Sequence, residues 1–410
     1  MTPAATELVE GELFRRRSAE LAVRVGANVQ RGQFVAVIAP PELAPIARDV
    51  ARAAWEAGAG DVQFFYLDDY ERFLLVAHGA EEMLDRTTIA HEAATRAWLD
   101  LQPAVIAVMG DLAPPHEELD PARLAKAVPR LGTELIQQLT NERRMAWAIL
   151  AAPTQTWAER VCGEPDVARL ERLVAQATRL DQDDPVAVWR ERLDVLERRC
   201  ELLDERSFGA VRFRGPGTDL TVPLAKGATW MGGRSTTAWG QPHAANLPTE
   251  EVFTAPDCRR TEGRLASTLP LLLDGSVVTD ISLSFDGGRV VSASAAEGEG
   301  VLHEFLRGQP DADRLGEVAL VAESAVAETG FAFQHTLFDE NAASHIAFGM
   351  AYRATVRDSE ALSDDECRER GINVSSRHVD LPIGGPDVEV DGLRGSDVTP
   401  IVRGSEWLLR

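Results

Sequence analysis

The sequence is poor in cysteine and in positive charge, and both shortages narrow the classes of protein to which it can belong. Its four cysteines are widely spaced, with no Cys-x-x-Cys pair and no disulfide-dense pattern, so we expect ordinary reduced thiols. Its 42 lysines and arginines are outnumbered by 65 aspartates and glutamates, which gives a formal net charge of −23. Because nucleic-acid binding depends on cationic contacts with phosphates, no nucleic-acid partner is expected.

Long apolar runs are also missing. No segment reaches the ~18 uninterrupted apolar residues that a membrane-spanning helix needs, so no membrane partner is expected. The first 17 residues place Glu10 and Glu12 ahead of the arginines at positions 15–17, whereas a signal peptide has a basic start and an apolar centre. We therefore expect a cytoplasmic protein.

In the first half of the chain, short apolar runs alternate with amphipathic stretches. Between the first two runs, Ile46, Val50 and Ala54 recur at the spacing of a helix. Such alternation predicts an α/β N-terminal domain with a mainly parallel sheet. The expected strands are residues 34–38, 62–66, 104–109 and 147–152, and two helices, 166–180 and 184–206, follow them.

The second half of the chain has a different pattern of predicted strands and helices, so we place the domain boundary near Ser207. The two predicted domains are residues 1–206 and 207–410. Short strands are separated by glycine-rich turns such as residues 286–288, which indicates an α+β C-terminal catalytic domain with a mixed sheet. The strands expected there are residues 210–213, 219–222, 276–285 and 290–295, and the helices are 299–307 and 340–351.

The predicted helix 340–351 carries the first candidate functional group. Asn341, His345 and Tyr352 are four and seven residues apart, a spacing that places all three on one face of a helix. An imidazole and a phenol on one face can be directed at one point. The same pattern also fits a helix face whose polar atoms only satisfy neighbouring backbone groups.

A second candidate is the triplet His378, Val379 and Asp380. In an extended segment, residues two apart point to the same side, so His378 and Asp380 can bind one cation or orient each other. The iron oxygenases that use a His-x-carboxylate pair take a second histidine from later in the chain. No histidine follows His378, which argues against that chemistry.

Carboxylates complete the set of candidates. Glu250 and Glu251 are adjacent, so in an extended chain they face opposite ways and only one of them can enter a site. Glu317 lies at the start of an apolar run, and an ionised carboxylate in such a place needs a partner or a metal. The six remaining histidines lack a ligand pattern and are expected at the surface. They are His78, His91, His116, His243, His303 and His335.

Taken together, these segments resemble the thermophilic metallo-aminopeptidase family, of the aminopeptidase T and aminopeptidase S type. The similarity extends over nearly the whole chain. In the second half it is carried by residues 214–220, 246–257, 260–263, 315–321, 336–352 and 378–380. In the first half it is carried by residues 21–28, by Gly32, Gly58 and Gly60, and by residues 181–185.

The resemblance implies that the chain is a two-metal aminopeptidase acting on peptides with a free N-terminus. It implies two divalent cations, zinc, cobalt or magnesium, with Glu317 bridging them and Tyr352 as the catalytic tyrosine. The implied ligands are Glu251, Glu317, His345, His378 and Asp380. It also implies a homodimer. Two cations that share a carboxylate can lower the pKa of a water towards neutrality, so metal-assisted hydrolysis is the expected chemistry.

One feature departs from the family pattern. Leu381 and Pro382 follow the His-x-Asp pair where the family tends to have bulkier residues, so the floor of the pocket and the substrate preference are expected to differ. Glu250 or Glu340 is a candidate proton carrier. The alternatives are a catalytically silent metal-binding homologue of the same fold and a structural oligomer whose acidic residues form a solvated face.

Overall fold

The computed structural model describes residues 8–112, 119–127, 129–359 and 361–410. Residues 1–7, at the start of the stretch compared with signal peptides, and His116 lie outside them. Contacts divide the chain into unit 1, Met1–Arg190 with Arg234–Leu247, and unit 2, Glu191–Gly233 with Pro248–Arg410. The boundary predicted near Ser207 falls inside unit 2, and the division lies instead within helix α9 (Pro185–Arg206).

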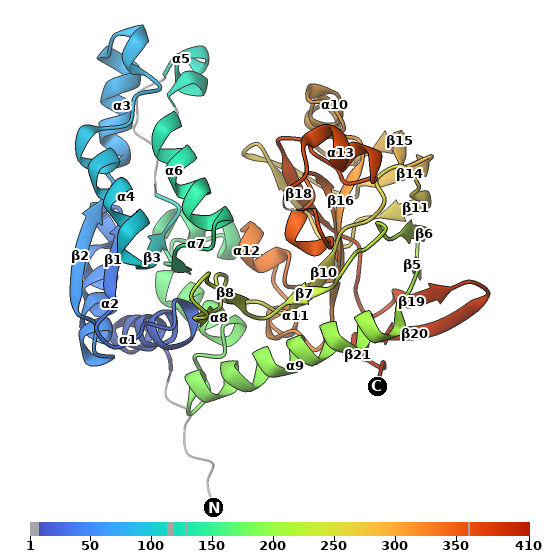
Figure 1. Ribbon diagram of the computed structural model, residues 1–410, viewed down its shortest axis with the longest axis horizontal. Helices are drawn as coiled ribbons and strands as arrows, with labels where there is room; N and C mark the ends of the chain where they lie inside the picture. The colour runs from blue at the N-terminus through green and yellow to red at the C-terminus, as the bar shows by residue number, and fades with distance from the viewer. Residues whose placement is uncertain (1–7, 113–118, 128, 360) are drawn as a thin grey trace, which may run out of the picture. The chain divides into compact units, whose positions relative to one another are not determined.

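Unit 1 is built on a parallel sheet of four strands in the order β2-β1-β3-β4 (Figure 1). Its strands lie within one residue of the four predicted from apolar runs. They are β1 (Phe34–Ala39), β2 (Asp61–Tyr66), β3 (Ala104–Met109) and β4 (Ala146–Ala151). The central strands β1 and β3 are buried on both faces and have continuous apolar sequences, which is why their runs could be recognised.

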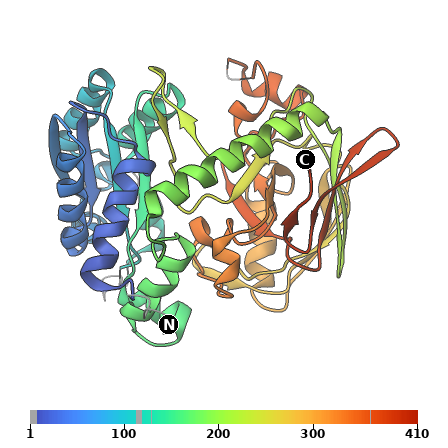
Figure 2. The same cartoon turned by 90° about the horizontal axis from the view of Figure 1, so that it is seen from below.

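Helices cover both faces of this sheet, as Figure 2 also shows. On one face, Val35 and Val37 pack with residues of α1 (Gly11–Leu21) and α2 (Ala44–Glu56). On the other, Ala36 and Val105 pack with Trp98 of α4 (Ile89–Leu101) and with residues of α6 (Arg130–Asn141). The α/β class predicted for the first half is confirmed.

The other helices of unit 1 are short, apart from α9, which begins there. They are η1 (Ala22–Gly26), η2 (Pro41–Leu43), α3 (Asp69–His78), η3 (Glu81–Met83), α5 (Pro121–Lys126), α7 (Gln155–Cys162) and α8 (Val167–Ala177). Residues 234–247 return to unit 1 with β8 (Ser235–Thr236) and β9 (Pro242–His243). There the Ile149 N–H donates to the Ala245 carbonyl at 2.9 Å, next to β4.

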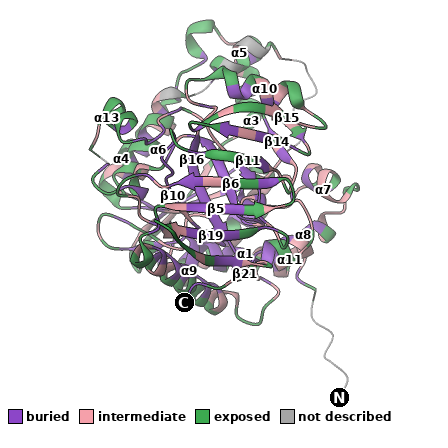
Figure 3. Cartoon of the chain, turned by 90° about the vertical axis from the view of Figure 1, so that its right-hand side faces the viewer, coloured by how far each residue is buried: buried purple, intermediate pink, exposed green. Residues whose placement is uncertain are grey.

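Unit 2 contains an antiparallel sheet of eight strands in the order β15-β14-β11-β6-β5-β19-β20-β21. One face of the sheet packs on the core, so more and less buried residues alternate along residues 210–215, 218–223 and 282–286, as Figure 3 shows for β5 and β6. The eight strands are β5 (Ala210–Gly215), β6 (Thr218–Pro223), β11 (Glu262–Ala266), β14 (Ser282–Asp286), β15 (Arg289–Ser294), β19 (Glu389–Arg394), β20 (Asp397–Arg403) and β21 (Glu406–Trp407).

The single strand predicted over residues 276–285 is wrong. The chain forms β13 (Ser276–Val278), paired with β12 (Leu271–Leu273), and then β14. Between them Asp280 adopts a left-handed backbone conformation, with φ of 50°, which ends the first strand.

A second sheet of unit 2 has the order β18-β17-β16-β10-β7, with every pairing antiparallel. One face of it supplies Val252, Val318, Leu320, Ile346, Phe348 and Leu381 to the hydrophobic core that it shares with the eight-stranded sheet. Its strands are β7 (Met231–Gly232), β10 (Glu251–Thr254), β16 (Leu315–Val321), β17 (His345–Gly349) and β18 (His378–Pro382). The opposite face is therefore free to carry polar side chains.

The helix predicted over residues 340–351 is also wrong. The chain forms a short helix, α12 (Thr336–Asp339), and His345 begins strand β17. The predicted helix 299–307 is confirmed as α10 (Glu299–Gly308). The remaining helices are α11 (Ala325–Glu328), η4 (Arg353–Thr355) and α13 (Asp364–Glu369). None of the helices in the described part of the chain combines the length and apolar character that crossing a bilayer requires.

Candidate metal centre

The five-stranded sheet brings all five predicted metal ligands to one face. Glu317 and Asp380 both pair with Ala347, and Ala319, two residues after Glu317, pairs with His345. Residues directly opposite each other in neighbouring strands, and residues two apart in one strand, point to the same face. By the same rule His378, two residues from Asp380, and Glu251, which pairs with Val321, share this face.

His345 lies at the centre of one group of side chains. Its Nε2 atom is 3.1 Å from Glu251 Oε2, 3.5 Å from Glu317 Oε1 and 3.9 Å from Asp380 Oδ1. His345 is 1% exposed. An imidazole and three carboxylates this close together and this deeply buried form a set of donors that suits a divalent cation.

Glu317 connects this group to a second one. Its other oxygen, Oε2, is 3.9 Å from His378 Nε2, which in turn is 3.1 Å from Asp380 Oδ1. Among the described residues, two groups can each hold a cation, Glu251 with Glu317 and His345, and Glu317 with His378 and Asp380. The carboxylate of Glu317, with one oxygen towards each histidine, is the member that the two groups share.

Backbone carbonyls orient both histidines. The Nδ1 atom of His345 lies 3.1 Å from the Ala343 carbonyl, and that of His378 lies 2.8 Å from the Met350 carbonyl. A carbonyl oxygen only accepts, so in each ring Nδ1 carries the proton and donates it. This arrangement directs the Nε2 atom into the cluster, so Nε2 is the atom that can bind a metal once it has lost its proton.

The charges of the cluster also fit bound cations. In the described part of the chain, Glu251 Oε2 is buried without a hydrogen bond of good geometry, despite its short distance to His345. Burial raises the pKa of Glu317 to about 6, although its hydrogen bond with His345 acts in the opposite direction. Burial acts to lower the pKa of His378, but the Asp380 carboxylate outweighs it and raises the pKa to about 9. Crowded carboxylates raise the pKa values of the histidines beside them because nearby positive charge stabilises the carboxylates. Bound cations would supply that positive charge.

Tyr352 lies beside this cluster, although the helix that was predicted to place it on one face with His345 does not form. Its ring is 5.0 Å from the His378 ring and 5.9 Å from the Phe253 ring, measured between centroids. Loss of solvation and the negative charges of Glu317 and Asp380 raise the pKa of Tyr352, so the phenol stays protonated at neutral pH. The side chain is 45% exposed, so it is accessible to a ligand.

The adjacent glutamates Glu250 and Glu251 separate as extended residues should. Glu251 joins the cluster, whereas the fully buried Glu250 accepts a hydrogen bond from Arg192 Nε at 2.5 Å. Of the two candidate proton carriers, only Glu340 faces the ligands. Burial and the charges of Glu251 and Asp380 raise the pKa of Glu340 well above its ordinary value.

A small hollow of about 80 Å³ opens next to the cluster and shares His378 and Asp380 with it. Its apolar wall consists of Pro270, Leu271, Leu272, Val379 and Pro382, and its polar wall consists of Thr336, Asp339 and Glu340. Asp339 is already engaged, because its carboxylate accepts the backbone N–H groups of Phe333 and His335 at 2.7 and 2.9 Å. Sequence patterns did not single out the segment 270–272, which has no polar group that indicates a site.

None of the other histidines in the described residues belongs to either ligand group. His78 is exposed, and His91, His303 and His335 are half-buried. The prediction that His243 lies at the surface is wrong, since it is 4% exposed and packs beside Trp147 in unit 1. Loss of solvation lowers the pKa of His243 to about 4, so it is a neutral side chain of the interior.

Comparison with known proteins shows that the chain resembles metalloproteases. Over residues 15–407 the sequence matches the family described as Thermophilic metalloprotease (M29). It is 40% identical over 400 residues to aminopeptidase T of Thermus aquaticus, covering 95% of this chain and 97% of that protein. It is 36% identical over 401 residues to aminopeptidase 2 of Geobacillus stearothermophilus, covering 95% and 96%.

The fold of the chain also matches that of a solved structure. The solved structure of wild-type AmpT from Thermus thermophilus superposes with a TM-score of 0.86 at 37% sequence identity. The superposition covers 96% of this chain and 99% of that one. Since both the family match and the relatives extend over nearly the full length, the chain belongs to the thermophilic metalloprotease (M29) family and is a metallopeptidase.

Proposed function

We propose that this metallopeptidase is an aminopeptidase that hydrolyses the first peptide bond of peptides with a free N-terminus. Relatives at 36 and 40% identity are named aminopeptidases, which supports this specificity. We further propose that five side chains of unit 2 hold two divalent cations, zinc, cobalt or magnesium. They are Glu251, Glu317, His345, His378 and Asp380.

One observation carries the two-metal proposal. The two possible ligand groups share Glu317, whose oxygens lie 3.5 Å from His345 Nε2 and 3.9 Å from His378 Nε2. A carboxylate shared in this way is the usual bridge of a paired metal site. The division of the remaining ligands follows the same geometry, Glu251 with His345 on one side and Asp380 with His378 on the other.

When bound, such cations polarise the scissile carbonyl and lower the pKa of a water so that it can act as a nucleophile near neutral pH. The protein's own groups do the rest. The protonated phenol of Tyr352 is suited to donate a hydrogen bond to the oxygen that gains negative charge, a type of contribution worth about 3 kcal/mol in other enzymes. Glu340, whose pKa is raised, is the group proposed to carry the proton to the leaving amine.

The hollow beside His378 and Asp380 is the proposed place for the first side chain of the substrate. Leu271, Leu272 and Pro382 line its apolar wall. We propose that this hollow favours small and medium aliphatic side chains. The homodimer and the cytoplasmic location also belong to the proposal, and light scattering and subcellular fractionation test them.

The activity is tested with unblocked and N-acetylated aminoacyl anilides. Treatment with a chelator should abolish hydrolysis of the unblocked substrate, and re-addition of zinc, cobalt or magnesium should restore it. Rapid cleavage of the acetylated substrate would point to an endopeptidase instead. Full metal content without turnover of any unblocked substrate would support the catalytically silent homologue.

A further inference from the structure

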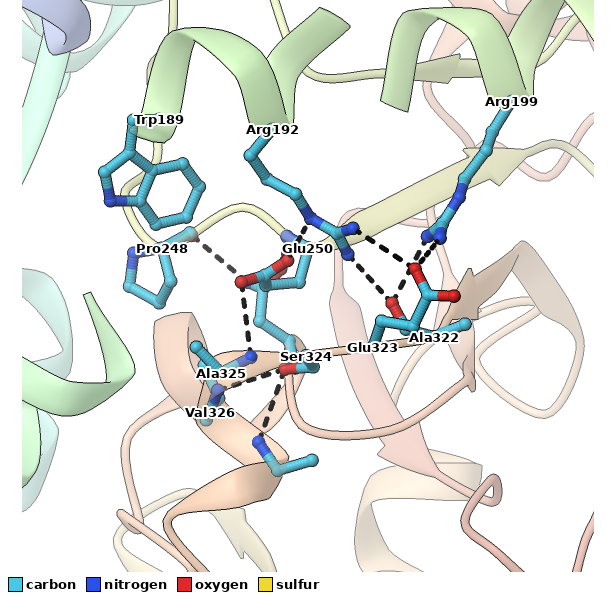
Figure 4. A network of polar contacts seen from close by, with 12 residues as sticks. Trp189, Arg192, Arg199, Pro248, Glu250, Ala322, Glu323, Ser324, Ala325 and Val326 are labelled. Carbon is cyan, nitrogen blue, oxygen red and sulfur yellow. Dashed lines mark hydrogen bonds and ion pairs between the residues drawn. The ribbon is translucent and has the colours of Figure 1, made fainter. Parts of the chain in front are cut away.

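Two arginines of α9 meet at the end of a ligand-bearing strand. Arg192 and Arg199 are seven residues apart, so they lie two turns apart on one face of the helix. Both donate to the Ala322 carbonyl, Arg192 Nη2 at 2.8 Å and Arg199 Nη1 at 3.2 Å (Figure 4). Ala322 directly follows β16, the strand that carries Glu317.

The carboxylates that accept the shortest hydrogen bonds of the two arginines differ in burial, although Glu323 also lies 3.8 Å from Arg192 Nη1. Arg192 Nε donates at 2.5 Å to Glu250, whose side chain is fully buried. Arg199 Nη2 donates at 2.5 Å to Glu323, whose side chain is 50% exposed. Removing a buried pair from water costs about as much as its attraction returns, so such a pair is a weak source of stability. A contribution to stability therefore does not by itself account for the buried pair of Arg192 and Glu250.

Glu250 is held at its backbone as well as at its side chain. Its N–H donates to Asn341 Oδ1 at 2.5 Å, and its Oε1 accepts from the Ala325 N–H at 3.4 Å. The Asn341 side chain is itself fixed by the carbonyls of Leu337 and Pro248, at 2.9 and 3.3 Å. All of these groups are buried, so Glu250 has little freedom to move.

The residue fixed in this way immediately precedes a metal ligand. Glu251 is the first residue of β10, and its ladder pairing with β16 begins at Val321. The strand pairing therefore holds the backbone from Glu251 onwards. The residue before it, Glu250, lies outside this pairing and is held by its own hydrogen bonds instead. Because neighbouring residues of an extended chain point to opposite faces, holding Glu250 in the interior directs Glu251 to the cluster.

We propose that Arg192 and Glu250, together with Asn341, are positioning residues that hold Glu251 in place to bind metal. This inference rests on the proposed metal site. Arg199 provides a matched comparison. Both arginines contact the Ala322 carbonyl and Glu323, whose Oε2 lies 2.5 Å from Arg199 Nη2 and 3.8 Å from Arg192 Nη1. The hydrogen bond to Glu250 comes from Arg192, whereas the Arg199 guanidinium lies 4.6 Å from the Trp407 ring in β21.

The test compares Arg192→Met, Glu250→Gln and Arg199→Met in the full-length, metal-depleted protein. Cobalt binding is measured by calorimetry and by the visible absorption of the ion, together with the thermal midpoint without metal. We expect all three changes to lower the midpoint. Only Arg192→Met and Glu250→Gln should weaken cobalt binding, by about 10- to 100-fold at one of two sites, and change its absorption. Arg192→Lys should restore part of the affinity.

Wild-type affinity and absorption in Arg192→Met and Glu250→Gln, with midpoints lowered as in Arg199→Met, would reduce the pair to a structural role and overturn the proposal. If Arg192→Met fails to fold, the near-isosteric Glu250→Gln variant decides the question alone. Failure of the proposed function gives a different result, since the wild-type protein itself would then bind no cobalt.

Discussion

Glu317 and Asp380 pair with the same residue, Ala347, from the two strands that flank β17. The alanine is fully buried, and all three side chains point to one face of the sheet. A methyl group is the smallest side chain that can occupy this central position in a strand. It leaves the space between the two carboxylates open for the proposed cations.

Replacing Ala347 with leucine should therefore remove tightly bound metal, because the larger side chain fills the space between Glu317 and Asp380. Elemental analysis after dialysis is the measurement. Ile346→Leu is the matched control, since Ile346 points to the opposite face, into the core, and the change conserves volume. Equal metal content in the two variants would show that the space above Ala347 holds no ion.

Replacing Tyr352 with phenylalanine should leave the metal content unchanged and lower kcat by about 100- to 1,000-fold, because only the hydrogen bond to the developing oxyanion is lost. Steady-state kinetics with an unblocked aminoacyl anilide, together with metal analysis, gives both quantities. If kcat is unchanged, the tyrosine has no part in the mechanism.

The stability of the protein should respond to pH in opposite directions with and without metal. In the metal-free protein the pKa of His378 is raised from 6.5 to about 9, so its stabilising protonation is complete below 6.5 and lost as the pH rises through 9. Glu317, raised from 4.5 to about 6, acts in the same direction at lower pH. Metal binding requires unprotonated histidines and is therefore favoured by rising pH.

The measurement is the rise in thermal midpoint caused by a fixed free concentration of cobalt, at about pH 6.5 and about pH 8.5. We expect the larger rise at the higher pH. A rise that is equal at both values would mean that the histidines do not release protons to the metal, and that they are not its ligands.

The hollow predicts a substrate preference. Leu272→Trp should fill it and lower kcat/KM for a leucine anilide by at least about 10-fold, while an alanine anilide is affected less. Val291→Trp is a control, because Val291 is 63% exposed on β15 and does not line the hollow. Parallel losses for both substrates would place the first side chain of the substrate elsewhere.

The sequence predicted part of this centre for sound physical reasons. Period-two geometry correctly placed His378 and Asp380 on one side of a strand, and it separated Glu251 from Glu250. It failed at His345. Strand β17 is buried on both faces, so its apolar run does not alternate, and such a run cannot be told from a buried helix by periodicity.

Other features depend on tertiary contacts that no local pattern encodes. Asn341 holds Glu250 through a bond between residues 91 apart in the chain, and Arg192 reaches Glu250 across 58 residues. The segment around Leu272 becomes a pocket wall only because β12 lies near the acidic end of α12. The division into units could not be predicted from local sequence patterns either, because residues 234–247 return to unit 1 after the chain has entered unit 2.

The central claim is that Glu317 holds two cations, one with each histidine. A crystal structure of the cobalt-loaded protein, with ions located by anomalous scattering, tests it most directly. We predict two peaks flanking the Glu317 carboxylate, one next to His345 Nε2 and one next to His378 Nε2. A single ion, or ions bound away from Glu317 in a protein that still hydrolyses unblocked anilides, would contradict the account.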